Sequence, residues 1–174
     1  MKIPPNLTPE QKRDFYASLT KEEYHSTLSR CCVGVGVILF NSQGQILVVK
    51  PNYREGWLLT GGTIDEGESP AQTAIRETFE EVGITLSAVT FLYVEFEHAL
   101  RATAPDFLEF MFSGGVLTDE QIAGIKLETA ELDEYAFVDP EKALEMLKGG
   151  SSHRLRVALE ALKNNMPIYG ESSR

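Results

Sequence analysis

The sequence is poor in basic residues, histidine and cysteine, and each shortage excludes a class of function. There are 16 Lys and Arg residues against 26 Asp and Glu residues, which gives a formal net charge of −10. This charge argues against a nucleic-acid polymer or an anionic membrane as the main partner. The two cysteines and three histidines have no zinc-site spacing. An anionic substrate would therefore have to be attracted locally, by a metal ion or a few basic side chains.

Long apolar runs are also missing. No stretch approaches the roughly 20 apolar residues that a membrane-spanning helix needs, and the polar start of the chain lacks the apolar core of a signal peptide. Cys31 and Cys32 are adjacent, and neighbours in a strand face opposite ways, which disfavours a disulfide between them. We therefore expect a cytoplasmic protein with two reduced, partly buried thiols.

The chain divides into a short N-terminal segment and one domain. Residues 1–28 begin with a Pro-rich arm, and Thr8 and Thr20 have the surroundings of helix N-caps, which predicts two short helices. Residues 29–174 are long enough for a single domain with its own core. Their apolar patterns predict strands at 31–40, 45–50, 85–98, 106–117 and 135–138, and helices at 69–82, 140–148 and 153–164. This succession predicts the α/β class, a mixed sheet with helices on both sides.

The most informative segment runs from Gly61 to Ile84, where two glycines precede a helix that carries Glu77, Glu80 and Glu81. Residues at i, i+3 and i+4 share one face of a helix. Three carboxylates on one face repel each other unless a cation lies among them, and hard oxygen ligands suit Mg²⁺ or Mn²⁺. The segment therefore predicts a metal-dependent enzyme that acts on a phosphorylated substrate.

The spacing of this segment resembles the Nudix box, the signature of the MutT/Nudix hydrolases. Gly62 is followed after five residues by Glu68 and after seven more by Arg76-Glu77, and Glu80-Glu81 precede Gly83 by one residue. One box position departs from the usual pattern, because Thr78 stands where relatives have an aliphatic residue. Thr60 likewise stands where relatives often have Pro. We expect Thr78 to turn its methyl inward and bond its hydroxyl to the preceding turn.

The resemblance implies a Nudix-type α/β/α sandwich, here with an extra N-terminal helical segment. It also implies roles for individual residues. The carbonyl of Gly61 would join Glu77, Glu80 and Glu81 as a metal ligand, while Glu68 and Arg76 would pair and hold the loop in shape. Direct binding of phosphate by Arg76 is the alternative for that side chain. Gly62 and Gly83 would shape the loop and end the helix.

The implied reaction is hydrolysis of a pyrophosphate bond in a nucleoside diphosphate linked to another group, such as a nucleoside triphosphate or a nucleotide-sugar. Mg²⁺, or Mn²⁺ in its place, would be the cofactor. Within the box Glu77 is the first choice for general base. The acids outside the box that could serve instead are Glu95, Glu97, Glu109, Glu128, Glu131 and Glu134, and among them Glu131 is favoured as a further metal ligand.

Two further points stay open. Tyr53 and Arg54 lie in a loop before the box, where they would either bind a base and a phosphate or form a polar surface. The chain is predicted to be a catalytic Nudix pyrophosphohydrolase that acts on a small nucleotide, and the alternative is a Nudix-fold regulatory module that binds a nucleotide without hydrolysing it. A homodimer is compatible with the sequence, and the N-terminal helices would either form its interface or cover the site.

Overall fold

The computed structural model describes residues 4–99 and 104–173, and the chain divides into two compact units, Met1–Cys31 and Cys32–Arg174. The smaller unit contains α1 (Pro9–Ser18) and α2 (Lys21–Thr27). Each helix begins with a capping box, in which the Thr8 or Thr20 hydroxyl accepts a bond from the backbone three residues on. Both predicted helices are therefore present, and neither has a buried side chain.

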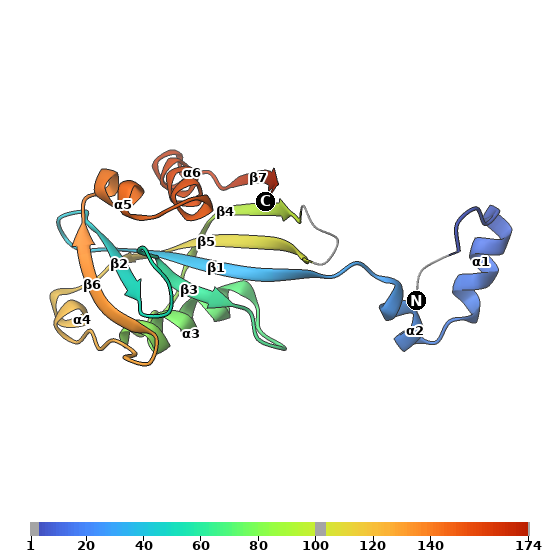
Figure 1. Cartoon of the computed structure of the whole chain (residues 1–174), viewed down its shortest axis with the longest axis horizontal. Coiled ribbons are helices and arrows are strands. Elements are labelled where there is room, and N and C mark those ends of the chain that lie inside the picture. The colour runs from blue at the N-terminus through green and yellow to red at the C-terminus, as the bar shows by residue number, and fades with distance from the viewer. Residues whose placement is uncertain (1–3, 100–103, 174) are drawn as a thin grey trace. The chain divides into compact units, whose positions relative to one another are not determined.

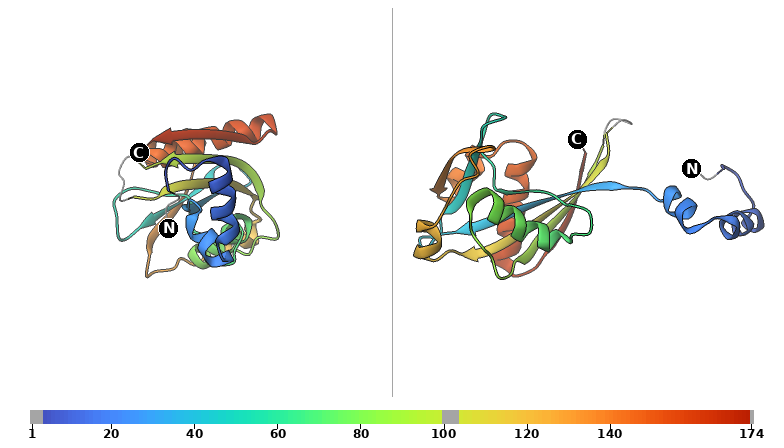
Figure 2. Two further views of the ribbon diagram at one scale, coloured as in Figure 1. Left: turned by 90° about the vertical axis from the view of Figure 1, so that its right-hand side faces the viewer. Right: turned by 90° about the horizontal axis from the view of Figure 1, so that it is seen from below.

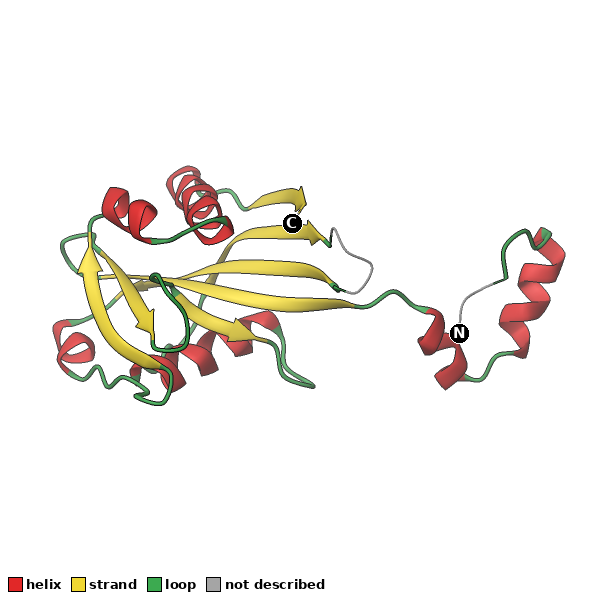
Figure 3. Cartoon of the chain, in the orientation of Figure 1, coloured by secondary structure: helices red, strands yellow, loops and turns green. Residues whose placement is uncertain are grey.

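The larger unit is built on a seven-stranded mixed sheet (Figures 1 and 3). The strands are β1 (Cys31–Phe40), β2 (Ile46–Pro51), β3 (Thr60–Thr63), β4 (Thr90–His98), β5 (Asp106–Val116), β6 (Leu132–Val138) and β7 (Ile168–Ser173). Their order is β6-β2-β1-β5-β4-β7, and β3 pairs with β1 off this path. The pairing of β4 with β7 is parallel, whereas β1 pairs antiparallel with both β2 and β3.

Helices cover both faces of this sheet, so the predicted α/β/α layering is confirmed. Alternate residues of a strand point to opposite faces, and along β1 Val37 and Leu39 enter one core while Ile38 enters the other. The first core includes residues of α3 (Pro70–Val82) and packs against α4 (Asp119–Ala123). The second includes residues of α5 (Pro140–Met146) and α6 (Gly150–Asn164). Figures 1 and 2 show these two layers of helices on either side of the strands.

The box helix α3 begins and ends where its sequence predicts. The Ser69 hydroxyl caps the backbone N–H of Gln72, and Pro70 occupies the first turn, where no N–H donor is needed. Gly83 ends the helix in the left-handed conformation at φ 74°. Thr78 is fully buried, and its hydroxyl donates to the carbonyl of Ala74 at 2.8 Å. The expected accommodation of a threonine in the box is thus confirmed.

Several predicted boundaries are wrong or incomplete. The strand predicted at 85–98 begins only at Thr90, because residues 85–89 form a loop that places the buried Leu86 in the first core without pairing. Strands β3 and β7 and helix α4 were not predicted. Strand β3 contains two glycines, which have low strand propensity, and α4 has only five residues. Both cysteines are free, but Cys31 is exposed instead of partly buried.

None of the helices in the described part of the chain is long and apolar enough to cross a membrane.

Candidate active site

Acidic side chains from α3 and from the segment before β6 line one cleft of about 720 Å³. Its wall on one side is the β3 backbone, and on the other side α3 contributes the box glutamates. The lining consists of Tyr53, Gly61, Gly62, Thr63, Arg76, Glu77, Glu80, Glu81, Glu128, Ala130 and Glu131. The cleft thus brings together the three box glutamates, Gly61 and Glu131, which sequence reasoning selected from positions up to 70 residues apart.

Gly61 must be a glycine because of the backbone on which it lies. Its φ of 146° is in the region that side chains rarely adopt, and a Cβ atom there would collide with the carbonyl oxygen of Val35 on β1. The backbone N–H of Gly61 donates to the carboxylate of Glu81 at 2.9 Å. This bond ties β3 directly to α3 and fixes the side chain of Glu81, which is only 8% exposed.

Gly62 is required for a different reason. A Cβ atom at Gly62 would collide with the carboxylate of Glu77, so this carboxylate lies directly against the backbone of β3. The two glycines of the box therefore have separate tasks. Gly61 lets β3 approach β1, and Gly62 leaves room for a carboxylate of α3.

Arg76 connects the loop to the box helix with all five of its N–H donors. Its Nε and Nη2 donate to the two oxygens of Glu68 at 2.8 and 3.0 Å, and Nη2 also donates to the carbonyl of Thr63 at 3.1 Å. Its Nη1 donates to Glu77 at 2.9 Å and to Glu80 at 2.8 Å. A phosphate could bind Arg76 only by displacing one of these groups, which favours the structural role over the phosphate-binding alternative.

The acids of the site differ strongly in their proton affinity. The hydrogen bond from Arg76 is the main cause that lowers the pKa of Glu68 to about 2, against an opposing effect of burial. Burial raises the pKa of Glu81 to about 8, opposed by the N–H of Gly61 and reinforced by neighbouring carboxylates. Burial also raises the pKa of Glu77, although Arg76 opposes the shift. For Glu77 and Glu81 the effect of burial outweighs the hydrogen bonds that they accept, whereas for Glu68 the bonds from Arg76 outweigh burial.

The donor set fits a hard divalent cation. Carboxylate oxygens and a backbone carbonyl are the ligands that Mg²⁺ and Mn²⁺ prefer, and the described residues that line the cleft include no competing thiol or imidazole. In the conformation described here, Glu77 and Glu80 bond to Arg76 and Glu81 bonds to Gly61. Consequently no three acidic, His or Cys side chains of the described residues are grouped closely enough to hold an ion without moving.

The remaining predicted site residues are divided among different places. Glu128 and Glu131 line the cleft, whereas Glu134 pairs with Lys50 at 3.5 Å on the surface. Glu95 and Glu97 are buried beside Arg154, away from the cleft.

His98 does not line the cleft, and its Nε2 is 3.9 Å from Glu171.

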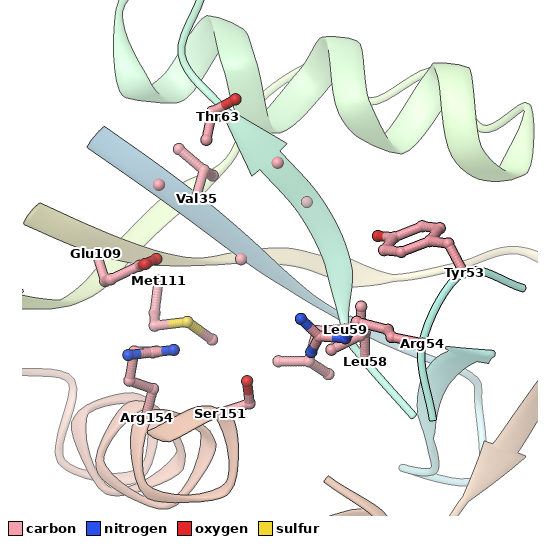
Figure 4. A pocket seen from close by; sticks show the side chains of 14 residues that line it. Val35, Tyr53, Arg54, Leu58, Leu59, Thr63, Glu109, Met111, Ser151 and Arg154 are labelled. Atoms are coloured by element: carbon pink, nitrogen blue, oxygen red, sulfur yellow. The ribbon is translucent and has the colours of Figure 1, made fainter. Parts of the chain in front are cut away.

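A second pocket of about 250 Å³ lies on the other side of β3 (Figure 4). It shares Tyr53 and the backbone of Gly61, Gly62 and Thr63 with the acidic cleft, so the two hollows are adjacent. Arg54 lines this pocket, as do Ser151 and Arg154 of α6. Sequence reasoning missed Arg154, because it lies in an ordinary amphipathic helix with no motif around it and is brought here only by the packing of α6.

Comparison with known proteins identifies the family. The family model described as NUDIX domain matches residues 32–159, which is most of the chain. An RNA pyrophosphohydrolase of Aliivibrio fischeri is 39% identical over 71 residues, and this match covers 41% of either protein. The chain thus matches about two fifths of the length of such curated relatives. The chain belongs to the Nudix/MutT family.

Solved structures show the same fold. A MutT NUDIX hydrolase from Burkholderia pseudomallei superposes with a TM-score of 0.58 at 25% identity, covering 77% of this chain and 99% of that one. A UDP-X diphosphatase superposes with a TM-score of 0.63 at 17% identity, covering 95% of this chain and 76% of that one. These superpositions cover most of the chain and show that the α/β/α fold is shared.

The ion pair of Glu68 and Arg76 predicts a pH-dependent contribution to stability. An acid whose pKa falls from about 4.5 to about 2 on folding stabilises the protein above its unfolded pKa. This contribution is lost as the pH falls through the folded value. Glu68→Gln should therefore lower the free energy of unfolding at pH 7, and its difference from the parent should shrink between about pH 4.5 and pH 2.

Urea denaturation at a series of pH values measures this difference. Glu66→Gln is the matched control, because Glu66 lies in the same loop with an exposed side chain. We expect this control to differ little from the parent throughout. A Glu68→Gln difference that stays constant from pH 7 to pH 2 would contradict the assigned role of the pair.

The two glycines predict two distinguishable defects. In Gly61→Ala, the added Cβ atom would collide with the backbone of β1 at a φ that side chains rarely adopt. This substitution should therefore lower the free energy of unfolding by about 1–3 kcal/mol. In Gly62→Ala, the added Cβ atom would collide only with the carboxylate at the end of the flexible Glu77 side chain, so the loss of stability should be smaller. The displaced Glu77 should weaken Mn²⁺ binding by about tenfold or more. Urea denaturation and calorimetric titration with Mn²⁺ measure the two effects. Equal loss of stability in both variants would refute this division of tasks.

Proposed function

We propose that this protein is a divalent-metal-dependent hydrolase of the pyrophosphate bond in a nucleoside diphosphate linked to another group. The observation that carries the proposal is the convergence of Glu77, Glu80, Glu81 and Glu131 on one cleft beside the backbone of Gly61. Such a concentration of carboxylates is unfavourable without a cation, and a diphosphate needs a cation to enter an acidic cleft. Membership of the Nudix/MutT family supports the same reaction.

Each residue has a part in this proposal. Glu77, Glu80, Glu81, Glu131 and the carbonyl of Gly61 would hold the ion. When bound, Mg²⁺ or Mn²⁺ supplies charge neutralisation for the diphosphate and a lowered pKa for a water molecule. Glu77 is the first candidate to accept the proton of the attacking water, because burial already raises its proton affinity.

Glu128 is the alternative base, since it lines the same cleft. The other candidate bases outside the box do not line the cleft. Glu95 and Glu97 form ion pairs with Arg154, Glu134 forms one with Lys50, and Glu109 lines the second pocket.

The second pocket would receive the nucleoside. It adjoins the cleft across Gly61 and Gly62, and Tyr53 lines both, so a nucleotide could extend from one into the other. Tyr53 is 66% exposed at this junction, where its ring is available for stacking. Arg54 would approach the phosphate nearest the nucleoside. The cleft and the second pocket together would hold one small nucleotide, and this proposal requires no binding site for a longer polymer.

RNA bearing a 5′-triphosphate is the second candidate substrate. The curated relatives named above are RNA pyrophosphohydrolases, although they match only part of this chain and the net charge of −10 opposes binding of a polymer. A regulatory module that binds a nucleotide without turnover is the remaining alternative. Retention of all the box glutamates argues against it.

An assay of phosphate and pyrophosphate release distinguishes these three possibilities. The assay takes nucleoside triphosphates, nucleotide-sugars, dinucleotides and a short 5′-triphosphate RNA, each with Mg²⁺ and with EDTA. We expect EDTA-sensitive hydrolysis of at least one small nucleotide, faster than that of the RNA. Preference for the RNA would select the second candidate, and nucleotide binding without hydrolysis would select the regulatory module.

Glu81→Gln should reduce the rate by orders of magnitude while the fold stays intact. The amide oxygen can still accept the bond from Gly61, and a neutral side chain suits a buried position, but an ionised ligand is lost. Glu160→Gln is the control, since Glu160 is exposed on α6. Steady-state rates and urea denaturation measure activity and stability. Near-parental turnover of Glu81→Gln would overturn the metal assignment.

We further infer that residues 29–174 form the hydrolase domain and that residues 1–28 serve as a dimerisation arm. The family match begins at residue 32, and α1 and α2 bury no side chain of their own while exposing Tyr16, Tyr24 and Leu28. Removal of residues 1–28 should leave hydrolysis unchanged and convert a dimer to a monomer. Light scattering and the rate assay test this, and an unchanged mass would refute the arm's role.

A further inference from the structure

Asn52 connects two segments that meet at the acidic cleft. One is the Tyr53 loop, residues 52–56, which carries Tyr53 and Arg54 at the edge of the second pocket (Figure 4). The other is the acidic turn, residues 128–131, whose two glutamates line the cleft. The loop follows β2 and the turn precedes β6, so the antiparallel pairing of these strands places the two segments side by side.

The regular pairing of β2 with β6 ends just before Asn52. Its register shifts at Pro51, which has no N–H to donate to the partner strand. Beyond this point the backbone N–H of Asn52 donates to the carbonyl of Glu131 at 2.9 Å. Its side-chain Nδ2 donates to the carbonyls of Ala130 at 3.0 Å and Thr129 at 3.4 Å. Three consecutive carbonyls of the acidic turn thus bond to one residue of the Tyr53 loop.

The acidic turn is anchored at both of its ends. The backbone N–H of Glu128 donates to the carbonyl of Glu81 at 3.0 Å, which ties the start of the turn to the box helix α3. Within the turn, Glu128 accepts hydrogen bonds from the backbone N–H groups of Ala130 and Glu131. The box helix therefore fixes the end that carries Glu128, whereas Asn52 fixes the end that carries Glu131.

The position of Glu131 matters to the acids of the box. Burial is the main cause that raises the pKa of Glu77 and of Glu81, and the charge of Glu131 adds to both shifts. This carboxylate therefore lies within electrostatic range of both box acids, although it comes from a separate segment of the chain. A cation held among these three groups requires the acidic turn to stay in place, and the bonds from Asn52 help to keep it there.

We propose that Asn52 is a positioning residue that makes the binding of the cation and the binding of the nucleoside cooperative. The inference rests on the proposed function, in which Glu131 holds the ion and Tyr53 contacts the nucleoside. Asn52 precedes Tyr53 in the chain and bonds to the backbone of Glu131, so one residue connects the two binding events. In the part of the chain that the structure describes, no other residue of the Tyr53 loop forms a hydrogen bond to the acidic turn.

The exposure of this connection explains how it couples two ligands. Asn52, Thr129 and Ala130 are all exposed, so water competes for their hydrogen bonds and these bonds open readily. A nucleoside that orders the Tyr53 loop also orders the connection, and a cation that orders the acidic turn does the same. The second ligand then finds the connection already formed and avoids the entropic cost of ordering it. By linkage, each ligand raises the affinity for the other by the same factor.

Equilibrium dialysis of nucleosides, with Mn²⁺ and with EDTA, measures this coupling. Adenosine, guanosine, cytidine and uridine lack the phosphates through which a nucleotide would contact the cation directly, so coupling to them passes through the protein. We expect Mn²⁺ to raise the affinity for at least one nucleoside about fivefold or more. Calorimetric titration with Mn²⁺ should show the same factor when that nucleoside is present. No binding of any nucleoside, or equal affinity with Mn²⁺ and with EDTA, would overturn the proposal.

Asn52→Ala tests the residue assignment. It keeps the backbone bond to Glu131 and removes both side-chain bonds, so the coupling factor should fall toward one and the affinity for Mn²⁺ about tenfold. Asn52→Gln retains an amide donor and should recover part of the coupling. Thr129→Ala is the control in the acidic turn, because it removes an exposed side chain and keeps the carbonyl that Asn52 uses. This control should retain the full coupling.

The outcomes separate this inference from a purely structural role and from the proposed function. If Asn52→Ala lowers only the stability in urea and leaves the coupling factor unchanged, Asn52 does not position the two sites and the proposal is wrong. Coupling that disappears in Asn52→Ala, with no hydrolysis of any nucleotide, would support the connection and refute the hydrolase. EDTA-sensitive hydrolysis by a parent protein without coupling would refute the connection alone.

Discussion

The guanidinium of Arg76 is the point on which the acidic cleft depends. Two carboxylates about 4 Å apart repel by about 4 kcal/mol at an effective dielectric constant of 20, and several gather around this corner of the fold. Arg76 bonds to Glu68, Glu77 and Glu80 at once and to the carbonyl of Thr63. It therefore holds loop, strand and helix together while the cleft remains acidic enough to attract a cation.

Strand β3 has an importance out of proportion to its four residues. Its two glycines bring the backbone close to β1 on one side and to a carboxylate of α3 on the other. The same backbone forms a wall of both the acidic cleft and the second pocket. A single short strand thus separates the place proposed for the diphosphate from the place proposed for the nucleoside.

Local chemistry explains which elements could be predicted. Capping boxes, a first-turn proline and a terminal glycine define α1, α2 and α3, because these signals act within a few residues of the chain. The failures at residues 85–89, β3 and β7 have a common cause. Leu86 is buried without being in a strand, and β3 and β7 are strands only because their partners β1 and β4 lie beside them.

The sequence by itself determined the family, the box helix and the identity of the acids around it, because fixed spacing on one helix determines which side chains share a face. Only the tertiary structure decided that Glu131 joins these acids, that Glu95 and Glu97 turn to Arg154, and that Arg154 reaches the second pocket. Those contacts join residues more than 50 positions apart. They depend on how β4, β5 and α6 pack, and no local pattern encodes that distance.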